Sequence, residues 1–506
     1  MSVLRLLPAL LATIVLLAAC GDGQEAREPD ATRVTADEAA QAAAILGLEE
    51  QGRASWSARE YTGGAFRFEN FELTLGEAEE ASGETGAVLR AEIMEIASPY
   101  LEGDIVRFDR LSLENAVLYD SDGGETRFER LVIDRPGPAL SRAVAASFTG
   151  SAPALPDLAG NLAAYSFREL ALTGLAVTLP GEEGALQAST VTLRGLDETG
   201  LELASVESIR FDSPAVRFGI ETARIEGVGS RMLAAMFRDS DASPLQLMIT
   251  GSPADYYRQL EITGLAGVAN GMAFEMDSLA GEVTPEGESL RTLASMPSLR
   301  LRAEADSDPG AQVEAALGFL GYEEIVLRFE TDAVYDPATD TIITQNNNRF
   351  IWEDGLTLDA HQEIIGVQAY SDAVATAHAS GIADPQTLAA LESLLRLQRL
   401  EVRLEDQSLL DRSFSAYALM NGVTPAQMRV QASALIALGL SALPAEIPRP
   451  FLNAIAGPLS DFVRDGGTLV IALDPPAPVP LPELTSASGE FDIDQLGLSV
   501  SVERSE

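Results

Sequence analysis

The residues of this chain that could carry out nucleophilic or zinc chemistry are few and scattered. Its two histidines, His361 and His378, lie far apart in the sequence. A zinc or nucleophilic site needs His, Cys or carboxylates clustered at defined spacing, and neither histidine has such a companion motif. We therefore interpret both as solvated polar residues. The sequence also lacks a Gly-x-Ser-x-Gly elbow, a phosphate loop and a dinucleotide fingerprint. We predict that the protein is not an enzyme and uses no cofactor.

One acidic segment could bind calcium. The run Asp120-Ser121-Asp122-Gly123-Gly124-Glu125 matches half of a calcium loop, but Gly124 stands where an EF-hand needs a carboxylate. Asp and Gly also favour hairpin turns, and we prefer that interpretation. Two shorter runs, Asp239-Ser240-Asp241 and Asp306-Ser307-Asp308, carry the same signal more weakly. We therefore predict no metal site.

The amino-terminal residues form a secretory signal. Arg5 is followed by an apolar run from Leu6 to Leu17 and then by Ala18-Ala19-Cys20. A short positive region, a short apolar region and small residues before a cleavage point are typical of exported proteins. The apolar run is too short to span a bilayer, which needs about 20 residues. We expect it to be removed, and no later stretch predicts a second span.

The end of that signal is specific. Leu17-Ala18-Ala19-Cys20 resembles the lipobox of bacterial lipoproteins, and Cys20 is the only cysteine in the chain. The resemblance implies cleavage before Cys20 and acylation of that residue, whose several acyl chains would anchor the protein stably. The alternative is a chance cysteine after an ordinary signal. In that family an Asp directly after the cysteine favours the inner membrane. Here Gly21 follows, so we expect the outer membrane, facing the periplasm, rather than the inner membrane.

Composition limits the partners. The hydrophobic fraction is 46% and the charged fraction 22%, as in globular proteins. The net charge is −43, and all 34 basic residues are Arg. Such a charge opposes binding to nucleic acid and to anionic headgroups, because both are polyanions. Its simplest role is solubility, in preference to dedicated cation binding. A single cysteine excludes a disulfide within the chain.

A recurring apolar pattern predicts a β-sheet. Apolar residues alternate with period two, so one strand face is apolar, but one spacing of three in each copy flips the phase. A β-bulge, or a bend between two strand halves, would return these residues to one side. Repeated units of this kind favour one extended sheet. The copies are Phe66, Phe68, Phe71 and Leu73; Val106, Phe108, Leu111 and Leu113; Phe128, Leu131 and Ile133; Tyr165, Phe167, Leu170 and Leu172; and Tyr257, Leu260 and Ile262. Three copies continue alike, as Asn115-Ala116-Val117, Gly174-Leu175-Ala176 and Gly264-Leu265-Ala266.

Arginines around the repeats should point outward and pair with carboxylates; the alternative is a basic row that binds headgroups. The residues in question are Arg67, Arg107, Arg110, Arg127, Arg130 and Arg168.

Helices should cover the apolar face. Thr35 and Glu38 form a capping-box pattern that predicts a helix from Ala36 to Leu46. Further helices are expected at the ranges Ala139 to Ser147, Arg231 to Arg238, Asp384 to Leu395, Ser408 to Met420, Thr424 to Ala442 and Pro450 to Arg464.

The body of the chain carries two further resemblances. The "aromatic-x-x-Leu-x-Leu-x-Asn/Gly" units resemble AsmA-like envelope proteins, which form β-grooves associated with lipid transport. Leu404-Glu405-Asp406-Gln407-Ser408-Leu409-Leu410-Asp411-Arg412, Thr424-Pro425, the Pro475 to Pro482 run and Tyr335-Asp336-Pro337-Ala338-Thr339-Asp340 resemble uncharacterised proteobacterial envelope proteins. The first resemblance implies lipid handling, and the second offers no activity.

We expect an α+β fold: an extended, curved, mostly antiparallel β-sheet of repeated strand units, with covering helices and a helix-rich C-terminal quarter. The expected segments are a signal peptide (1–19), a flexible tether (20–33), the repeated sheet with its first helix (34–382), a helix-rich region (383–474), and a Pro-rich edge segment with terminal strands (475–506). The expected function is a non-enzymatic envelope lipoprotein, anchored to the membrane through Cys20, that shelters or transfers lipid such as phospholipid. The alternative is a structural or adaptor lipoprotein that binds envelope proteins in the periplasm, with its own helices filling the sheet.

Overall fold

The protein is mostly antiparallel β-sheet with some helices. The computed structural model describes residues 34–504, apart from 76–86, 104, 121–122, 151–160, 180–183, 234–256, 305–306, 346, 381, 383–384, 443–448 and 486–495. The chain divides into two compact units. Unit 1 consists of Met1–Ile249 with Asp255–Ile262, and unit 2 of Thr250–Ala254 with Thr263–Glu506. The signal, Cys20 and the tether lie outside the described residues.

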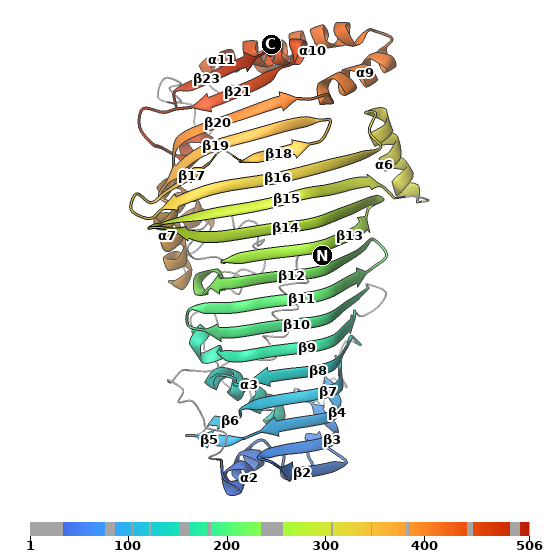
Figure 1. The fold of residues 1–506 in the computed structure, drawn as a ribbon, viewed down its shortest axis with the longest axis vertical. Helices are drawn as coiled ribbons and strands as arrows, with labels where there is room; N and C mark the ends of the chain where they lie inside the picture. The colour runs from blue at the N-terminus through green and yellow to red at the C-terminus, as the bar shows by residue number, and fades with distance from the viewer. Residues whose placement is uncertain are drawn as a thin grey trace. The chain divides into compact units, whose positions relative to one another are not determined.

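Unit 1 is a meander of antiparallel strands. β3, β4, β7, β8, β9, β10, β11 and β12 pair with their neighbours in chain order (Figure 1). β1 and β2 both pair with β3, and β5 with β6 forms a separate hairpin. The elements are α2 (Ala36–Ile45), β1 (Ala54–Ser55), β2 (Ala58–Thr62), β3 (Ala65–Thr74), β4 (Val88–Ala97), β5 (Tyr100–Glu102), β6 (Ile105–Arg107), β7 (Arg110–Tyr119), β8 (Glu125–Asp134), α3 (Pro138–Thr149), the 3-10 helix η3 (Leu162–Tyr165), β9 (Phe167–Thr178), β10 (Ala185–Asp197), β11 (Gly200–Asp212) and β12 (Val216–Gly229).

The phase flip predicted from the repeat is a bend, and no residue is inserted. β4 and β7 keep one register on both sides of it, because Ala91 faces Ala116 and Ile93 faces Glu114. Asn115 lies between these pairs with φ 48°, in the left-handed region that Asn tolerates better than most residues. Left-handed residues occupy the equivalent position on alternate strands: Asn70 in β3, Asn115 in β7, Gly174 in β9 and Ser208 in β11. We call this row the kink line.

Because neighbouring strands bend together, their apolar residues return to the same face. Inner-face residues therefore recur at spacings of two, three and two. They include Phe66, Phe68, Phe71 and Leu73 of β3; Leu89, Ala91, Met94 and Ile96 of β4; Leu111, Leu113, Ala116 and Leu118 of β7; and Leu170, Leu172, Leu175 and Val177 of β9.

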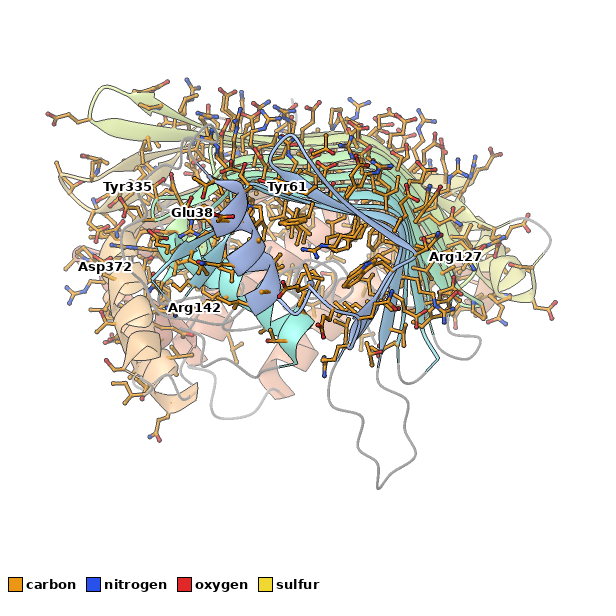
Figure 2. All side chains as sticks on the ribbon, turned by 90° about the horizontal axis from the view of Figure 1, so that it is seen from below. Glu38, Tyr61, Arg127, Arg142, Tyr335 and Asp372 are labelled. Carbon is orange, nitrogen blue, oxygen red and sulfur yellow. The ribbon has the colours of Figure 1, made fainter. Side chains whose placement is uncertain are left out.

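Helices of unit 1 begin where the sequence predicts. Thr35 caps α2: its hydroxyl accepts from Glu38 N at 3.3 Å, and its own N–H donates to the Glu38 carboxylate at 2.9 Å. α3 confirms the predicted helix and ends at Gly150 in the left-handed conformation. Figure 2 shows that the helices carrying Glu38 and Arg142, α2 and α3, lie inside the curve of the unit 1 sheet. Of the helix expected after Arg231, the structure describes helical residues only to Leu233.

Unit 2 is also an antiparallel sheet, and the boundary between the units falls within β13 (Gln259–Ala269). β14, β15, β16, β19, β20, β21 and β23 follow in chain order, with β17 and β18 between β16 and β19, and β22 beside β20. The strands are β14 (Met272–Glu286), β15 (Ser289–Ala303), β16 (Glu324–Asp336), β17 (Thr341–Thr344), β18 (Arg349–Trp352), β19 (Leu356–Ile365), β20 (Arg396–Asp406), β21 (Thr468–Leu473), β22 (Val479–Pro480) and β23 (Leu498–Glu503).

Helices alternate with strands in unit 2. They are α6 (Asp308–Phe319), α7 (Val367–Ala379), α8 (Pro385–Leu391), η5 (Glu392–Leu394), α9 (Leu409–Asn421), α10 (Pro425–Ala442), α11 (Arg449–Asp465) and α12 (Leu481–Thr485). Thr424 caps α10: Thr424 N donates to Gln427 Oε1 at 3.0 Å, and Gln427 N donates back to the Thr424 hydroxyl at 3.2 Å. The Pro-rich run is extended only briefly, at β22, before α12 begins.

Three repeat assignments are wrong in detail. Val106 lies in the separate β5–β6 hairpin and Phe108 between strands, so the phase of β7 flips at Asn115 and not before Leu111. Tyr165 belongs to η3, because Asn161 Oδ1 accepts from Ala164 N at 3.3 Å and starts a helical turn there. Tyr257 precedes β13.

Candidate functional site: the apolar inner faces

The inner face of unit 1 is a set of apolar rows that cross the strands. One row contains Phe68, Met94, Leu113, Leu131, Leu172, Val191 and Val206, each paired with the next. Phe68 and Met94 are completely buried. A face this continuous must be covered by protein or by another apolar body, because water contact costs about 25 cal/mol per Å².

Helices cover the first strands of unit 1. Phe148 of α3 packs on Phe71 of β3 with ring centroids 6.0 Å apart, and Leu140 of the same helix is 2% exposed. η3 packs against β10. On β12, by contrast, Phe218, Ile220 and Ile225 are only half-buried. Burial of the inner face therefore decreases from β3 to β12.

Unit 2 carries an equivalent row. Met296, Phe329, Phe350, Leu358, Leu404, Leu469 and Val502 pair in succession from β15 to β23. A second row joins Leu299, Leu327, Trp352 and Leu356. Both rows run along the face that also buries Tyr335 and Ala333 of β16. We call this face, with its two rows, the unit 2 inner face.

Three helices cover one end of the unit 2 inner face. Phe462 and Val463 of α11 form a buried cluster with Leu469 of β21. Partly buried residues of α9, α10, α11 and the neighbouring strands complete it: Leu404, Leu410, Phe414, Ala432, Ile436, Leu459, Ile471, Val500 and Val502. The helices expected in this region therefore fill the sheet at β20, β21 and β23.

The other end of the same row, from β15 to β18, is much less covered. Phe329 is 37% exposed, and Met296 and Phe350 beside it are only half-buried. Trp352 of the second row stacks near Tyr322, with ring centroids 5.3 Å apart, and its indole N–H has no hydrogen-bond partner within the described structure. The strands β15 to β18 thus present a partly exposed apolar surface.

The side chain of Asn348 takes the place of a backbone pair between β17 and β18 and keeps β18 aligned with β16. β17 and β18 both pair with β16 but are interrupted before Asn348. Asn348 Oδ1 accepts from Asp332 N at 3.0 Å, and its Nδ2 donates to Asp332 O at 3.0 Å. The amide thereby mimics a backbone pair and aligns Phe350 with Phe329.

The outer faces are charged. Arg291 donates to both carboxylate oxygens of Asp332, at 2.9 and 2.7 Å, and this holds the pKa of the Asp332 carboxyl below its usual range. In unit 1, hydrogen bonds from Arg224 and Arg258 likewise lower the pKa of Glu226. Partly exposed pairs such as those of Glu226 contribute little stability each. Asp332 is only 6% exposed, so its carboxylate depends more strongly on its arginine partner.

Three of the six repeat arginines pair with carboxylates as predicted. Arg110 and Arg168 pair with Asp134, and Arg127 pairs with Glu125. Arg107 contradicts the outward prediction, because it is 6% exposed. Its guanidinium donates to Glu102 at 2.7 Å and to the Pro136 carbonyl at 3.0 Å, and so joins the β5–β6 hairpin to the start of α3. No sequence signal distinguishes it from its neighbours.

The other predicted site residues are not brought together. His361 is an exposed residue of β19 opposite Glu401, and His378 lies in α7. Gly123 N donates to Asp120 O at 3.2 Å, so the calcium-like run is the β7–β8 turn; Ser121 and Asp122 lie outside the described residues. Ser307 caps α6, and Asp239 to Asp241 are not described. Among the described residues, no group of three His, Cys, Asp or Glu could hold a metal ion.

Comparison with known proteins gives one match. A family model described as "Uncharacterized protein" matches residues 349–503, from β18 to the end of β23. No curated protein matches the chain. In the described part of the chain no helix is long and apolar enough to cross a membrane.

Proposed function

We propose that this protein is a non-enzymatic envelope lipoprotein, anchored through Cys20, that shelters or transfers lipid on an apolar sheet face. The observation that carries the proposal is the half-covered row Met296, Phe329 and Phe350 on the unit 2 inner face. Helices pack on the first strands of unit 1 and on β20, β21 and β23 of unit 2, whereas this stretch of unit 2 is partly exposed.

The dimensions of that row suit an acyl chain. From β15 to β19 it crosses three strand spacings of about 4.8 Å each, so roughly 14 Å of apolar surface lies across the strands. The two rows together make the surface wider than one side chain. Each buried methylene of a ligand would contribute about 0.8 kcal/mol, so even part of an acyl chain would bind usefully there.

Charge favours the tail of the lipid over its headgroup as the recognised part. The net charge of −43 repels anionic headgroups, and the outer-face arginines are already paired with carboxylates. A neutral or zwitterionic lipid held by its acyl chains is therefore the expected ligand.

Two residues of equal exposure provide the test. Phe329 lies on the unit 2 inner face and is 37% exposed, whereas Leu293 lies on the outer face opposite Asp332 and is 38% exposed. The chain purified in mild detergent is exchanged into buffer and loaded with pyrene-labelled phosphatidylcholine. Phe329→Gln should weaken lipid retention several-fold while Leu293→Gln retains it. Equal retention in both variants, or a lipid-free mass for the parent protein in native mass spectrometry, would refute lipid handling.

The second candidate is a structural or adaptor lipoprotein. The packing of α9 to α11 over the last strands favours it, because this part of the sheet is filled by the chain itself. A lipid-free protein that crosslinks to a defined envelope protein would support this role.

A further inference from the structure

The tip of the α9–α10 hairpin is the most exposed apolar surface among the described residues. Leu419 and Met420, in the last turn of α9, are 85% and 69% exposed. Val430, in the second turn of α10, is 57% exposed. Tyr417 is 52% exposed and contacts Phe319 of α6 edge-to-face, with centroids 5.7 Å apart. We call these four residues of α9 and α10 the tip patch.

The tip patch lies in the part of the chain with the fewest charges. Between Ser413 and Ala445 the only charged residue is Arg429, in a protein whose charged fraction is 22%. That guanidinium is withdrawn from the surface: it donates to the Val463 carbonyl at 2.7 Å and to Asp411 at 2.6 Å, and its side chain is 13% exposed. A surface so depleted of charge matches a partner without charge.

The turn between α9 and α10 is closed by local hydrogen bonds. Gly422 N and Val423 N both donate to Ala418 O. Thr424 and Gln427 bond reciprocally at the start of α10. The remaining carbonyls of the last turn of α9 can stay hydrated if the turn lies at the headgroup level of a membrane.

We propose that the tip patch inserts into the interfacial region of a lipid bilayer. Leucine, methionine and valine would enter the acyl boundary, and Tyr417 would lie at the headgroup level that suits its ring and hydroxyl. Insertion depends on apolar contact alone, since the tip offers no cation to anionic lipids. This inference is independent of the lipid-handling proposal, because it concerns a different surface and needs no lipid bound to the sheet.

A local reporter tests insertion whatever else anchors the chain. The full-length protein, with both native tryptophans replaced by Trp56→Phe and Trp352→Phe, is incorporated in phosphatidylcholine vesicles with brominated acyl chains, and a single tryptophan is introduced by Leu419→Trp. The introduced indole should lose roughly half or more of its emission, because interfacial helices bury 5–10 Å into this region. The matched control is Ile382→Trp, an apolar position of unit 2 that is 57% exposed and outside the patch, and its indole should be unaffected.

Two further outcomes decide the proposal. Met420→Glu beside the Leu419→Trp reporter should abolish the quenching, because a charge opposes insertion, and 0.5 M salt should leave the parent signal unchanged. Equal quenching at the two reporter positions, or none at Leu419→Trp, would overturn the proposal. So would a lipid-free dimer in sedimentation that buries the same indole, since the partner would then be a second copy of the chain.

Discussion

The kink line requires residues that tolerate the left-handed backbone conformation, and this requirement can be measured at Asn115. Its φ of 48° is a conformation in which a side chain with a branched Cβ is strained. Its Nδ2 also donates to Glu92 on the neighbouring strand at 2.6 Å. Asn115→Val should lose about 1–2 kcal/mol through the backbone conformation and about 1 kcal/mol through the hydrogen bond. We therefore expect a total loss of about 2–3 kcal/mol in the free energy of unfolding of unit 1.

The matched control is Asn115→Gly, which loses the same hydrogen bond but adopts the conformation freely. It should cost about 1 kcal/mol or less. The two tryptophans separate the units, because Trp56 contacts Phe68 in unit 1 with centroids 5.1 Å apart and Trp352 belongs to unit 2. In a Trp352→Phe background, urea unfolding followed by Trp56 fluorescence should show Asn115→Val roughly 0.5–1 M below the glycine variant. Equal midpoints would refute the idea that the left-handed residue is required at the bend.

Three other predictions concern burial, pH and the anchor. Phe108→Asp should strongly destabilise unit 1, because Phe108 is 3% exposed and a carboxylate there would be buried without a partner; an unchanged thermal midpoint would contradict this. Asp332→Asn should destabilise unit 2 at neutral pH. Because the pKa of Asp332 is lowered in the folded state, the difference should begin to shrink as the pH falls below the ordinary value of 3.8 and vanish only below the lowered folded-state pKa, as pH-dependent urea titrations would show. Cys20→Ser should abolish labelling by radioactive palmitate and leave an uncleaved or soluble precursor, and normal labelling would exclude the lipid anchor.

Periodicity was sufficient to predict the strands, their apolar face and the existence of a phase flip. The signal for the flip was also present, since Asn115, Gly174 and Gly264 occupy equivalent places in three repeats and all have positive φ. The choice between bulge and bend could not be made from one strand. It depends on whether the partner strand flips at the same pair, and that is a property of register.

Helix starts were similarly predictable because they are local. Thr35 with Glu38 and Thr424 with Gln427 form their reciprocal bonds within one turn. Arg107 was not predictable, because its burial depends on the Pro136 carbonyl, which approaches it only in the folded unit. The extent of cover on each sheet face was also beyond the sequence. The helices of residues 409–465 are apolar enough to pack on strands, but only the fold shows that they stop before Phe329.

Because the inner faces of the two units are covered to different extents, lipid binding to each unit can be measured separately. A ligand that binds only the folded state stabilises it by mass action, by about 2.7 kcal/mol at a hundredfold excess over its dissociation constant. If lipid occupies the row through Phe329, that stabilisation belongs to unit 2, where Trp352 lies in the adjacent row beside Leu327. Loading with phosphatidylcholine should then raise the urea midpoint reported by Trp352 in a Trp56→Phe background. The midpoint reported by Trp56 should stay where it was, because Phe148 of α3 already covers Phe71 and the first strands of unit 1. A rise in the Trp56 transition alone would mean that lipid enters unit 1 instead, through the half-buried residues of β12, and that the row in unit 2 is not the site.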